Sequence, residues 1–238
     1  MKPFGFKHFS IRQTQAAMKV GTDSMLLGAL CNFEGASALL DIGTGTGVLA
    51  LMIAQRFNPE TLTAVEMDDL AFEDARENLE KNPFTTKIDL VHTDIRSFNP
   101  GKLFDGIITN PPFFENSSQS SNAERNLARH TNELSFEELF TVSYGLLKPS
   151  GKLWIILPAD STENNCKTAA KAGLFLQTLI SIEGKPGKTV RSVMEFGKTT
   201  IPVTSSNFTV RNENGSYTDA YIELTKEFHG VDLRLKKD

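Results

Sequence analysis

The sequence predicts an α/β fold in which helices cover both faces of a mostly parallel sheet. Apolar runs of strand length alternate with amphipathic helical patterns along most of the chain, which is the order expected of such a sheet. The chain has 238 residues, 39% hydrophobic and 23% charged, and this composition is typical of a soluble globular domain with one core. We therefore expect residues 1–238 to form a single domain, with an N-terminal extension over 1–35 and additional strands over 201–238.

Seven strands and four helices are expected from these patterns. The strands lie near 38–42, 61–66, 87–92, 103–109, 151–157, 175–183 and 190–199. The helices lie near 47–57, 69–81, 135–147 and 160–172. Asp68 and Asp69 are placed to cap the second helix, and Ser135 with Glu138 predicts a capping box at the third.

A glycine-rich turn follows the first of these strands. The segment 39–49 reads L-L-D-I-G-T-G-T-G-V-L, and its glycines allow a tight turn and a close approach of the backbone to a ligand. Glu66 ends the next strand about 20 residues later, where a carboxylate would meet ribose hydroxyls. The third glycine comes too early for the dinucleotide motif G-x-G-x-x-G, and no P-loop lysine follows.

The tetrapeptide Asn110-Pro111-Pro112-Phe113 follows the strand expected at 103–109. The two prolines fix φ and lack N–H donors, so the Asn110 amide oxygen and the Pro111 carbonyl remain as acceptors. Two converging acceptors suit an exocyclic or amide NH2 group, and Phe113 offers a ring for stacking. A simple proline turn after a strand agrees equally well with these four residues alone.

Together these segments resemble the class I S-adenosylmethionine-dependent methyltransferases. The loop D-x-G-x-G-x-G, an acid after the second strand, Asp94 after the third, and N-P-P-F occur in that family's order over residues 39–113. The resemblance implies a seven-stranded sheet with an antiparallel last strand, and S-adenosyl-L-methionine as cofactor. It implies that the loop binds the methionine group, Glu66 the ribose and Asp94 the adenine.

The N-terminal segment narrows the resemblance. The sequence F-G-F-K-H-F-S-I-R-Q, followed by M-K-V-G-T-D over 18–23, looks like the opening of the bacterial methyltransferases that act on N6 of adenosine 37 in a valine tRNA. In that family the K-V-G-T-D segment lies against the cofactor, although Asp23 could equally be a helix N-cap. The implied cofactor-binding residues are Lys19, Thr22, Asp41, Gly43, Thr44, Gly45, Gly47, Glu66, Met67, Asp94, Ile95 and Asn110. The implied catalytic residues are Asn110, Pro111, Pro112 and Phe113.

Two basic segments suggest where an RNA would bind. The first is the N-terminal arm, with Lys2, Lys7, His8, Arg12 and Lys19; the second is the loop 185–191. Either could be ordinary surface charge, but both beside a nucleotide pocket would favour the anticodon loop of a tRNA as partner. The polar segment 115–132 is expected to be a loop; its position suggests a lid ordered by substrate, and a plain disordered loop agrees nearly as well.

Composition limits the other possible functions. The formal net charge of −4 argues against indiscriminate coating of nucleic acid. We see no apolar run of membrane-spanning length and no signal peptide, and Cys31 and Cys166 lack metal-ligand spacing. We therefore expect a cytoplasmic protein without a metal site and without contact to a membrane.

Several alternatives remain open from the sequence. Protein-glutamine and ribosomal guanine-N2 methyltransferases also use an Asn-Pro-Pro motif to accept hydrogen bonds from the substrate nitrogen. A small-molecule methyltransferase would share the cofactor loop. A non-catalytic RNA-binding module could have kept the fold. The intact acid-glycine loop, N-P-P-F and the N-terminal segment favour the tRNA adenine methyltransferase.

Overall fold

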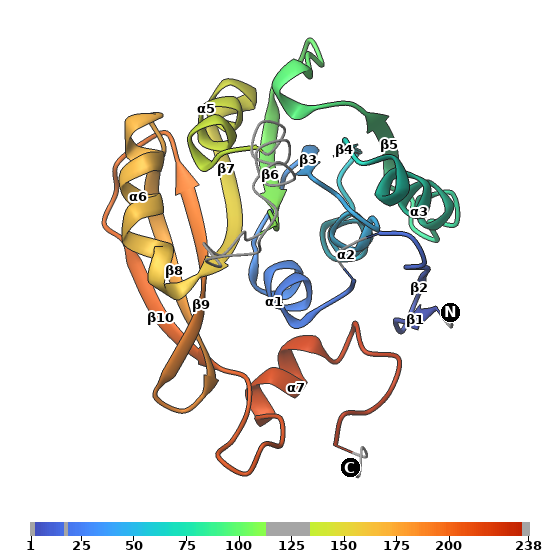
Figure 1. Cartoon of the computed structure of the whole chain (residues 1–238), viewed down its shortest axis with the longest axis vertical. Helices are drawn as coiled ribbons and strands as arrows, with labels where there is room; N and C mark the ends of the chain where they lie inside the picture. The colour runs from blue at the N-terminus through green and yellow to red at the C-terminus, as the bar shows by residue number, and fades with distance from the viewer. Residues whose placement is uncertain (1–2, 17–18, 113–133, 235–238) are drawn as a thin grey trace, which may run out of the picture.

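A single eight-stranded sheet forms the centre of the protein (Figure 1). The computed structural model describes residues 3–16, 19–112 and 134–234. The strand order is β10-β8-β9-β7-β6-β3-β4-β5. Strand β9 runs antiparallel to both of its neighbours, and the other adjacent pairs are parallel. The observed sheet confirms the expected α/β class with a mostly parallel sheet, but it has eight strands where seven were implied, because β10 is added at its edge.

The elements have the following bounds. The strands of the sheet are β3 (Ala38–Ile42), β4 (Thr61–Glu66), β5 (Lys87–His92), β6 (Phe104–Thr109), β7 (Leu147–Pro158), β8 (Phe175–Lys185), β9 (Lys188–Gly197) and β10 (Thr204–Thr209). The α-helices are α1 (Thr22–Leu30), α2 (Val48–Phe57), α3 (Asp69–Leu79), α5 (Phe136–Leu146), α6 (Thr162–Lys171) and α7 (Asp219–Thr225). The two short 3-10 helices are η1 (Ile95–Ser97) and η2 (Ala159–Ser161), and β1 (Phe4–Gly5) with β2 (Ser10–Ile11) forms a small hairpin.

Apolar cores lie on both faces of the sheet. One core joins the sheet to α1, α2, α3 and α7, and the other joins it to α5, α6 and η1 (Figure 1). Every residue of α2 from Val48 to Ala54 is buried, so this helix is covered all round rather than along one stripe. Burial on both faces explains why the strands read as continuous apolar runs instead of alternating patterns.

Most predicted elements are confirmed, and two regions differ. All seven expected strands and four expected helices are present, with the Asp68 cap and the Ser135–Glu138 capping box as predicted. The region after 201 was expected to add strands, but it adds the strand β10 and then the helix α7. Asp23 does not cap α1; Gly21 stands at the N-cap, without a side-chain cap bond.

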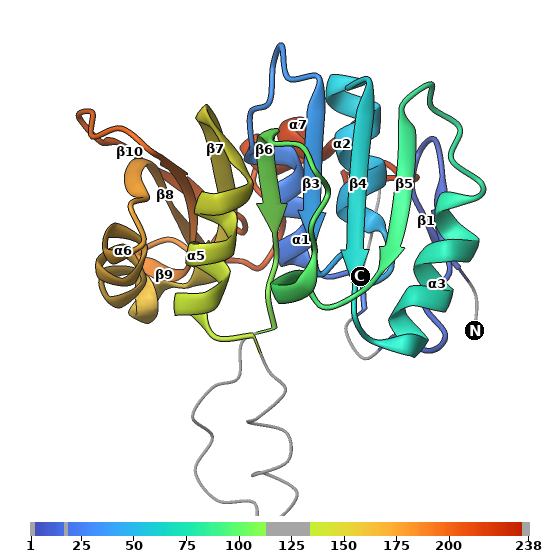
Figure 2. The same cartoon turned by 90° about the horizontal axis from the view of Figure 1, so that it is seen from above.

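The parallel strands place their carboxyl ends at one edge of the sheet (Figure 2). Ile42 pairs with Val65 and with Thr109, and Glu66 pairs with His92, so β3, β4, β5 and β6 end together. Ligands of open α/β sheets bind outside the carboxyl ends of the strands. We call this the carboxyl edge, and the predicted site residues that follow these strands lie there.

Candidate active site

The glycine loop between β3 and α2 leaves room for a ligand at the carboxyl edge. Gly43 and Gly45 have φ values of 66° and 58°, a region that side chains rarely adopt. A Cβ added at either glycine would meet no atom within 4 Å, so the backbone faces open space there. Gly47 also has a positive φ and forms the N-cap of α2.

Asp41 is a fully buried carboxylate beneath this loop. Its Oδ2 accepts a hydrogen bond of 2.6 Å from the Thr44 hydroxyl, whereas its Oδ1 is buried without a hydrogen-bond partner among the described residues. Burial, with the neighbouring Glu66 charge as a smaller cause, raises the pKa of Asp41 to about 7. A buried acceptor that lacks a partner is costly, and a cationic or hydrogen-bonding ligand would satisfy it.

Glu66 holds the loop to the end of β4. Its Oε2 accepts from the Gly45 amide at 2.8 Å, and its Oε1 accepts from the amides of Met67 and Asp68 at 2.8 and 2.9 Å. The Glu66 side chain is buried, whereas Met67 is 46% exposed beside it. A carboxylate has about four acceptor positions, and three are taken by these amides, so Glu66 retains about one position for a ligand hydroxyl.

Asp94, expected to contact adenine, is already bonded to Arg96. Both Asp94 oxygens accept from the Arg96 guanidinium, and Oδ1 also accepts from the Arg96 amide at 2.8 Å. These hydrogen bonds hold the pKa of the Asp94 carboxyl below its usual range. Arg96 also reaches Glu138 of the capping box. Ile95 buries its side chain in the core, and its carbonyl accepts from the Phe98 amide at 3.2 Å.

Asn110 follows β6 and is anchored from two directions. The hydroxyl of the preceding Thr109 donates to the Ile42 carbonyl at 2.9 Å, which ties the ends of β6 and β3 together. The Asn110 side-chain nitrogen donates to Ser24 Oγ of α1 at 3.1 Å. Its Oδ1 is buried without a hydrogen-bond partner among the described residues. The oxygen therefore keeps its capacity to accept hydrogen bonds.

The remaining predicted site residues differ in exposure, and one of them is not described by the structure. Pro111 is half-buried and Pro112 exposed after β6, and Phe113 lies outside the described residues, as does the segment 115–132. Lys19 is exposed, and Thr22 is the exposed first residue of α1. The structure therefore brings together the glycine loop, Glu66, Asp94, Asn110 and the start of α1.

Residues 14–16, which we call the N-terminal strap, are held against α3 ahead of Lys19. Asp74 of α3 accepts hydrogen bonds from the Thr14 hydroxyl and from the amides of Gln15 and Ala16, at 2.8 to 3.0 Å. These donors hold the pKa of Asp74 below its usual value despite burial of the carboxylate. Asn78 of the same helix donates to the Thr46 carbonyl of the glycine loop at 2.9 Å.

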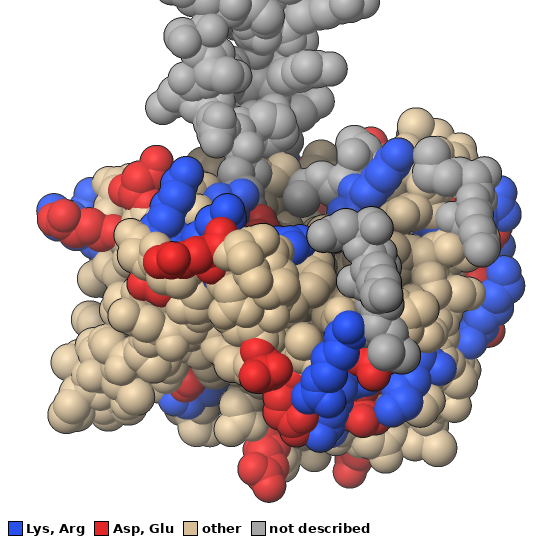
Figure 3. Space-filling view, turned by 90° about the horizontal axis from the view of Figure 1, so that it is seen from below, with Lys and Arg blue, Asp and Glu red and all other residues tan. Residues whose placement is uncertain are grey.

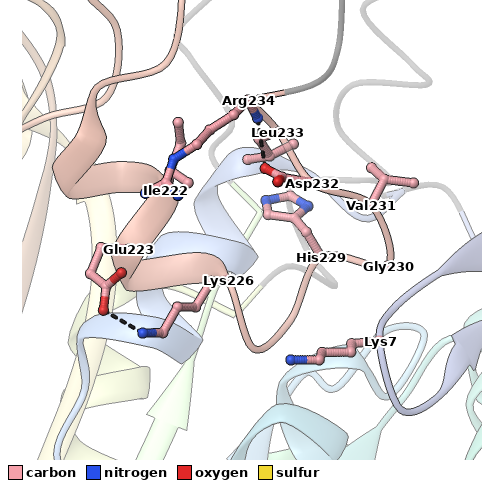
Figure 4. Close-up of a pocket in the computed structure, with 10 residues that line it drawn as sticks. All are labelled: Lys7, Ile222, Glu223, Lys226, His229, Gly230, Val231, Asp232, Leu233 and Arg234. Carbon is pink, nitrogen blue, oxygen red and sulfur yellow. Dashed lines mark hydrogen bonds and ion pairs between the residues drawn. The ribbon is translucent and has the colours of Figure 1, made fainter.

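A separate cavity lies away from this site. It has a volume of about 340 Å³ and is lined by α7 and the segment that follows it (Figure 4). Gln55, near the end of α2 remote from the glycine loop, donates to the Glu227 carbonyl next to this cavity. Lys7 pairs with Glu227 and Lys226 with Glu223. Figure 3 shows basic and acidic side chains lying side by side on this surface.

Neither a metal-binding cluster nor a membrane-spanning helix occurs in the described part of the chain. Among residues 3–16, 19–112 and 134–234, no three His, Cys, Asp or Glu side chains are grouped so as to hold a metal ion. Within the same ranges, no helix is long and apolar enough to cross a membrane.

Comparison with known proteins identifies the family. Residues 15–167 match the methyltransferase small domain family model. A tRNA1(Val) (adenine(37)-N6)-methyltransferase of Pseudoalteromonas translucida is 39% identical over 230 residues, covering 96% of this chain and 99% of that protein. The protein of the same name from Trichodesmium erythraeum is 39% identical over 231 residues, covering 95% and 97%. The chain belongs to this methyltransferase family.

Solved structures support the fold. A predicted O-methyltransferase from Agrobacterium tumefaciens aligns over 87% of this chain and 96% of its own, with a TM-score of 0.65 at 20% identity. A methyltransferase from Pyrococcus furiosus aligns over 74% of this chain and 81% of its own, with a TM-score of 0.53 at 24% identity. The class I methyltransferase fold implied by the sequence is confirmed.

Sequence reasoning missed three residues that shape the site. Ser24 contacts Asn110, Arg96 engages Asp94, and Asp74 anchors the N-terminal strap. Arg96 stands two residues after Asp94, a spacing at which one side chain can bond the other. This contact could therefore have been predicted from the sequence. Ser24 and Asp74 act across 86 and about 60 residues of sequence, and their spacing carried no such signal.

Proposed function

We propose that this protein transfers a methyl group from S-adenosyl-L-methionine to N6 of an unpaired adenosine in tRNA, adenosine 37 of a valine tRNA. The observation that carries the proposal is the Asn110 amide oxygen, buried without a partner among the described residues at the carboxyl edge. The name shared by the relatives from Pseudoalteromonas and Trichodesmium supports the choice of substrate.

The residues at the carboxyl edge fit this cofactor. The open space over Gly43 and Gly45 suits close backbone approach, and the unsatisfied Oδ1 of Asp41 suits a donor such as the ammonium of the methionine group. Glu66 would accept from a ribose hydroxyl, and Asp94 from the adenine amine beside the backbone of Ile95. When bound, S-adenosylmethionine supplies an electrophilic methyl group on a positively charged sulfur.

Asn110 and Pro111 accept hydrogen bonds from the adenine amine. The lone pair of an adenine amine is delocalised into the ring, so the nitrogen is a poor nucleophile unless its hydrogens are engaged. Asn110 Oδ1 and the Pro111 carbonyl each accept one N6–H, which favours a pyramidal nitrogen with its lone pair directed away from both acceptors. Positioning of this kind can account for most of the rate in a two-substrate transfer.

The acceptor base must leave its stack to reach these oxygens. Unstacking a loop nucleotide costs less free energy than unstacking a paired one, which favours an adenosine in an anticodon loop. The role of Phe113 as a stacking partner remains a prediction from the sequence. The hairpin between β8 and β9 carries the exposed Lys185 and Lys188, and its strands place it at the carboxyl edge. These two lysines would contact phosphates of the bound tRNA.

A transfer assay with two matched RNAs tests the proposal. Purified protein and labelled S-adenosylmethionine are incubated with an unmodified valine tRNA transcript, or with the same transcript carrying guanosine at position 37. We expect label in the first RNA alone. Equal labelling of both transcripts would reject adenosine 37 as the target, and labelling of neither would reject tRNA methylation itself.

A further inference from the structure

An ion pair joins the start of α1 to the start of β9. Arg191 Nε lies 2.8 Å from Asp23 Oδ2, although the two residues are 168 positions apart in the chain. The side chains are 33% and 25% exposed, so the contact is shielded from solvent more than most surface pairs. A second guanidinium nitrogen of Arg191 donates to the Val190 carbonyl at 3.0 Å. Arg191 is therefore fixed on its own strand as well as to α1.

The same turn of α1 holds the acceptor amide. Ser24, the residue after Asp23, accepts the hydrogen bond from the Asn110 side-chain nitrogen at 3.1 Å. The N-cap residue of the helix, Gly21, makes no side-chain cap bond, so the first turn lacks the usual local cap. The Asp23 carboxylate in that turn also has the sign favoured near a helix N-terminus. The ion pair thus adds a side-chain anchor to a first turn that has no N-cap bond and is otherwise held by the Ser24–Asn110 hydrogen bond and by burial.

We propose that Asp23 and Arg191 are positioning residues for methyl transfer, because they hold the first turn of α1 and thereby the Asn110 amide. This inference rests on the proposed function, in which Asn110 accepts the adenine amine. The chain of contacts runs from Arg191 to Asp23, from the adjacent Ser24 to Asn110, and so to the buried Oδ1. A displacement of about 1 Å in such a group can lower a transfer rate on the order of a hundredfold.

Arg191 was expected from the sequence to belong to an RNA-binding rim with the two hairpin lysines. The ion pair gives it a different role, which separates it from Lys185 and Lys188 on the exposed turn. Direct phosphate contact would make removal of the Arg191 charge weaken tRNA binding and flatten its salt dependence. A positioning role predicts unchanged tRNA affinity with a lower rate of transfer.

A double-mutant cycle distinguishes these roles. The variants are Asp23→Asn, Arg191→Gln and their combination, measured for kcat, for KM of tRNA and for S-adenosylmethionine affinity. We expect each single variant to lower kcat by about tenfold, with both affinities within about twofold of wild type, and the double variant to be no worse than the singles. Asp23→Glu, which keeps the carboxylate, should recover most of the rate.

A second ion pair on the same strand serves as the matched control. Lys152 and Glu195 join β7 to β9 with a 2.6 Å contact and exposures of 35% and 15%, but Glu195 lies four residues farther along β9. Lys152→Gln should leave kcat unchanged within about twofold even if it lowers thermal stability. An equal decrease of kcat in this control would show that the effect is general destabilisation, and would overturn the proposal.

Amide hydrogen exchange tests the same contact without any RNA. Exchange in the peptide covering residues 20–27 should be faster in Arg191→Gln than in wild type or in Lys152→Gln, because the first turn of α1 is no longer anchored. Unchanged exchange, or a wild-type rate of transfer in both single variants, would overturn the inference. If the wild-type protein methylates no tRNA, the proposed function is rejected. The exchange measurement would still test whether the Asp23–Arg191 ion pair stabilises the first turn of α1.

Discussion

The side-chain nitrogen of Asn110 lies 3.1 Å from Oγ of Ser24, so the acceptor amide after β6 is held from the first turn of α1. The amide oxygen of the same side chain is buried and has no hydrogen-bond partner in the described part of the chain. The start of α1 therefore contacts Asn110, the acceptor residue of the proposed function. Substitutions on the two sides should affect methyl transfer and cofactor binding separately.

Replacement of Asn110 by alanine would remove one of the two acceptors proposed for the substrate amine. We expect kcat to fall by about two orders of magnitude, the scale of removing one preorganised hydrogen bond in the transition state, while cofactor affinity stays nearly intact. Steady-state kinetics with calorimetry measures both quantities. Asn164→Ala, on the exposed surface of α6, serves as control. Normal turnover of Asn110→Ala would mean that the proline tetrapeptide is only a turn.

Glu66→Gln tests the ribose contact while keeping the shape of the side chain. Removal of the charge should weaken S-adenosylmethionine binding by about 1.5–3 kcal/mol, the usual worth of a hydrogen bond to a charged group. Calorimetric titration measures the affinity, and Glu163→Gln on the exposed face of α6 should bind normally. An affinity equal to wild type in Glu66→Gln would remove this carboxylate from the cofactor site.

The buried Asp41 should make the cofactor-free protein sensitive to pH. Folding raises the pKa of Asp41 from 3.8 to about 7, so the folded protein binds this proton more tightly than the unfolded chain. The stabilising contribution is full below about pH 4 and is lost as the pH rises through about 7. Asp41→Asn removes this pH dependence and keeps an acceptor for the Thr44 hydroxyl.

Urea unfolding of wild type and Asp41→Asn provides the test. The stability of the variant relative to wild type should increase between about pH 4 and about pH 7, by at most about 1.4 kcal/mol per pH unit, and then level off. Saturating S-adenosylmethionine should lower the apparent pKa if its ammonium meets this carboxylate. A difference in stability that is constant with pH would show that Asp41 does not titrate in this range.

Neutralising Lys185 and Lys188 tests the hairpin as a tRNA-binding element. The double change to glutamine should weaken tRNA binding and reduce the log-log salt slope by about 0.7–0.9 for each phosphate that the hairpin no longer neutralises. Affinity measured at several salt concentrations gives the slope. Lys167→Gln with Lys171→Gln, on α6, changes the net charge equally and should leave the slope unaltered. Identical slopes for the hairpin variant and wild type would exclude the hairpin from the interface.

The sequence predicted the elements of the sheet well because each carries its own local signal. Strands buried on both faces read as apolar runs, and the Ser135–Glu138 capping box is a local pattern that the structure confirms. The helix α1 was not assigned, because its start lacks a side-chain cap and most of its residues are buried, which weakens the amphipathic pattern. The helix α7 was taken for strand because it is short and follows a true strand.

Prediction of the site was limited by long-range contacts. The motifs located the glycine loop, Glu66, Asp94 and Asn110, since each follows a strand whose carboxyl end reaches the same edge. The partners of these residues come from distant segments, as Ser24 does for Asn110 and Asp23 for Arg191. Such pairings depend on how the chain folds and leave no spacing pattern to read.

The central claim is that this protein makes N6-methyladenosine at position 37 of a valine tRNA. Nucleoside mass spectrometry of that tRNA, isolated from a strain that lacks the gene and from its parent, tests it most directly. We predict that N6-methyladenosine disappears in the deletion strain, returns with the wild-type gene and does not return with the Asn110→Ala variant. An unchanged content of N6-methyladenosine in tRNA from the deletion strain would contradict it.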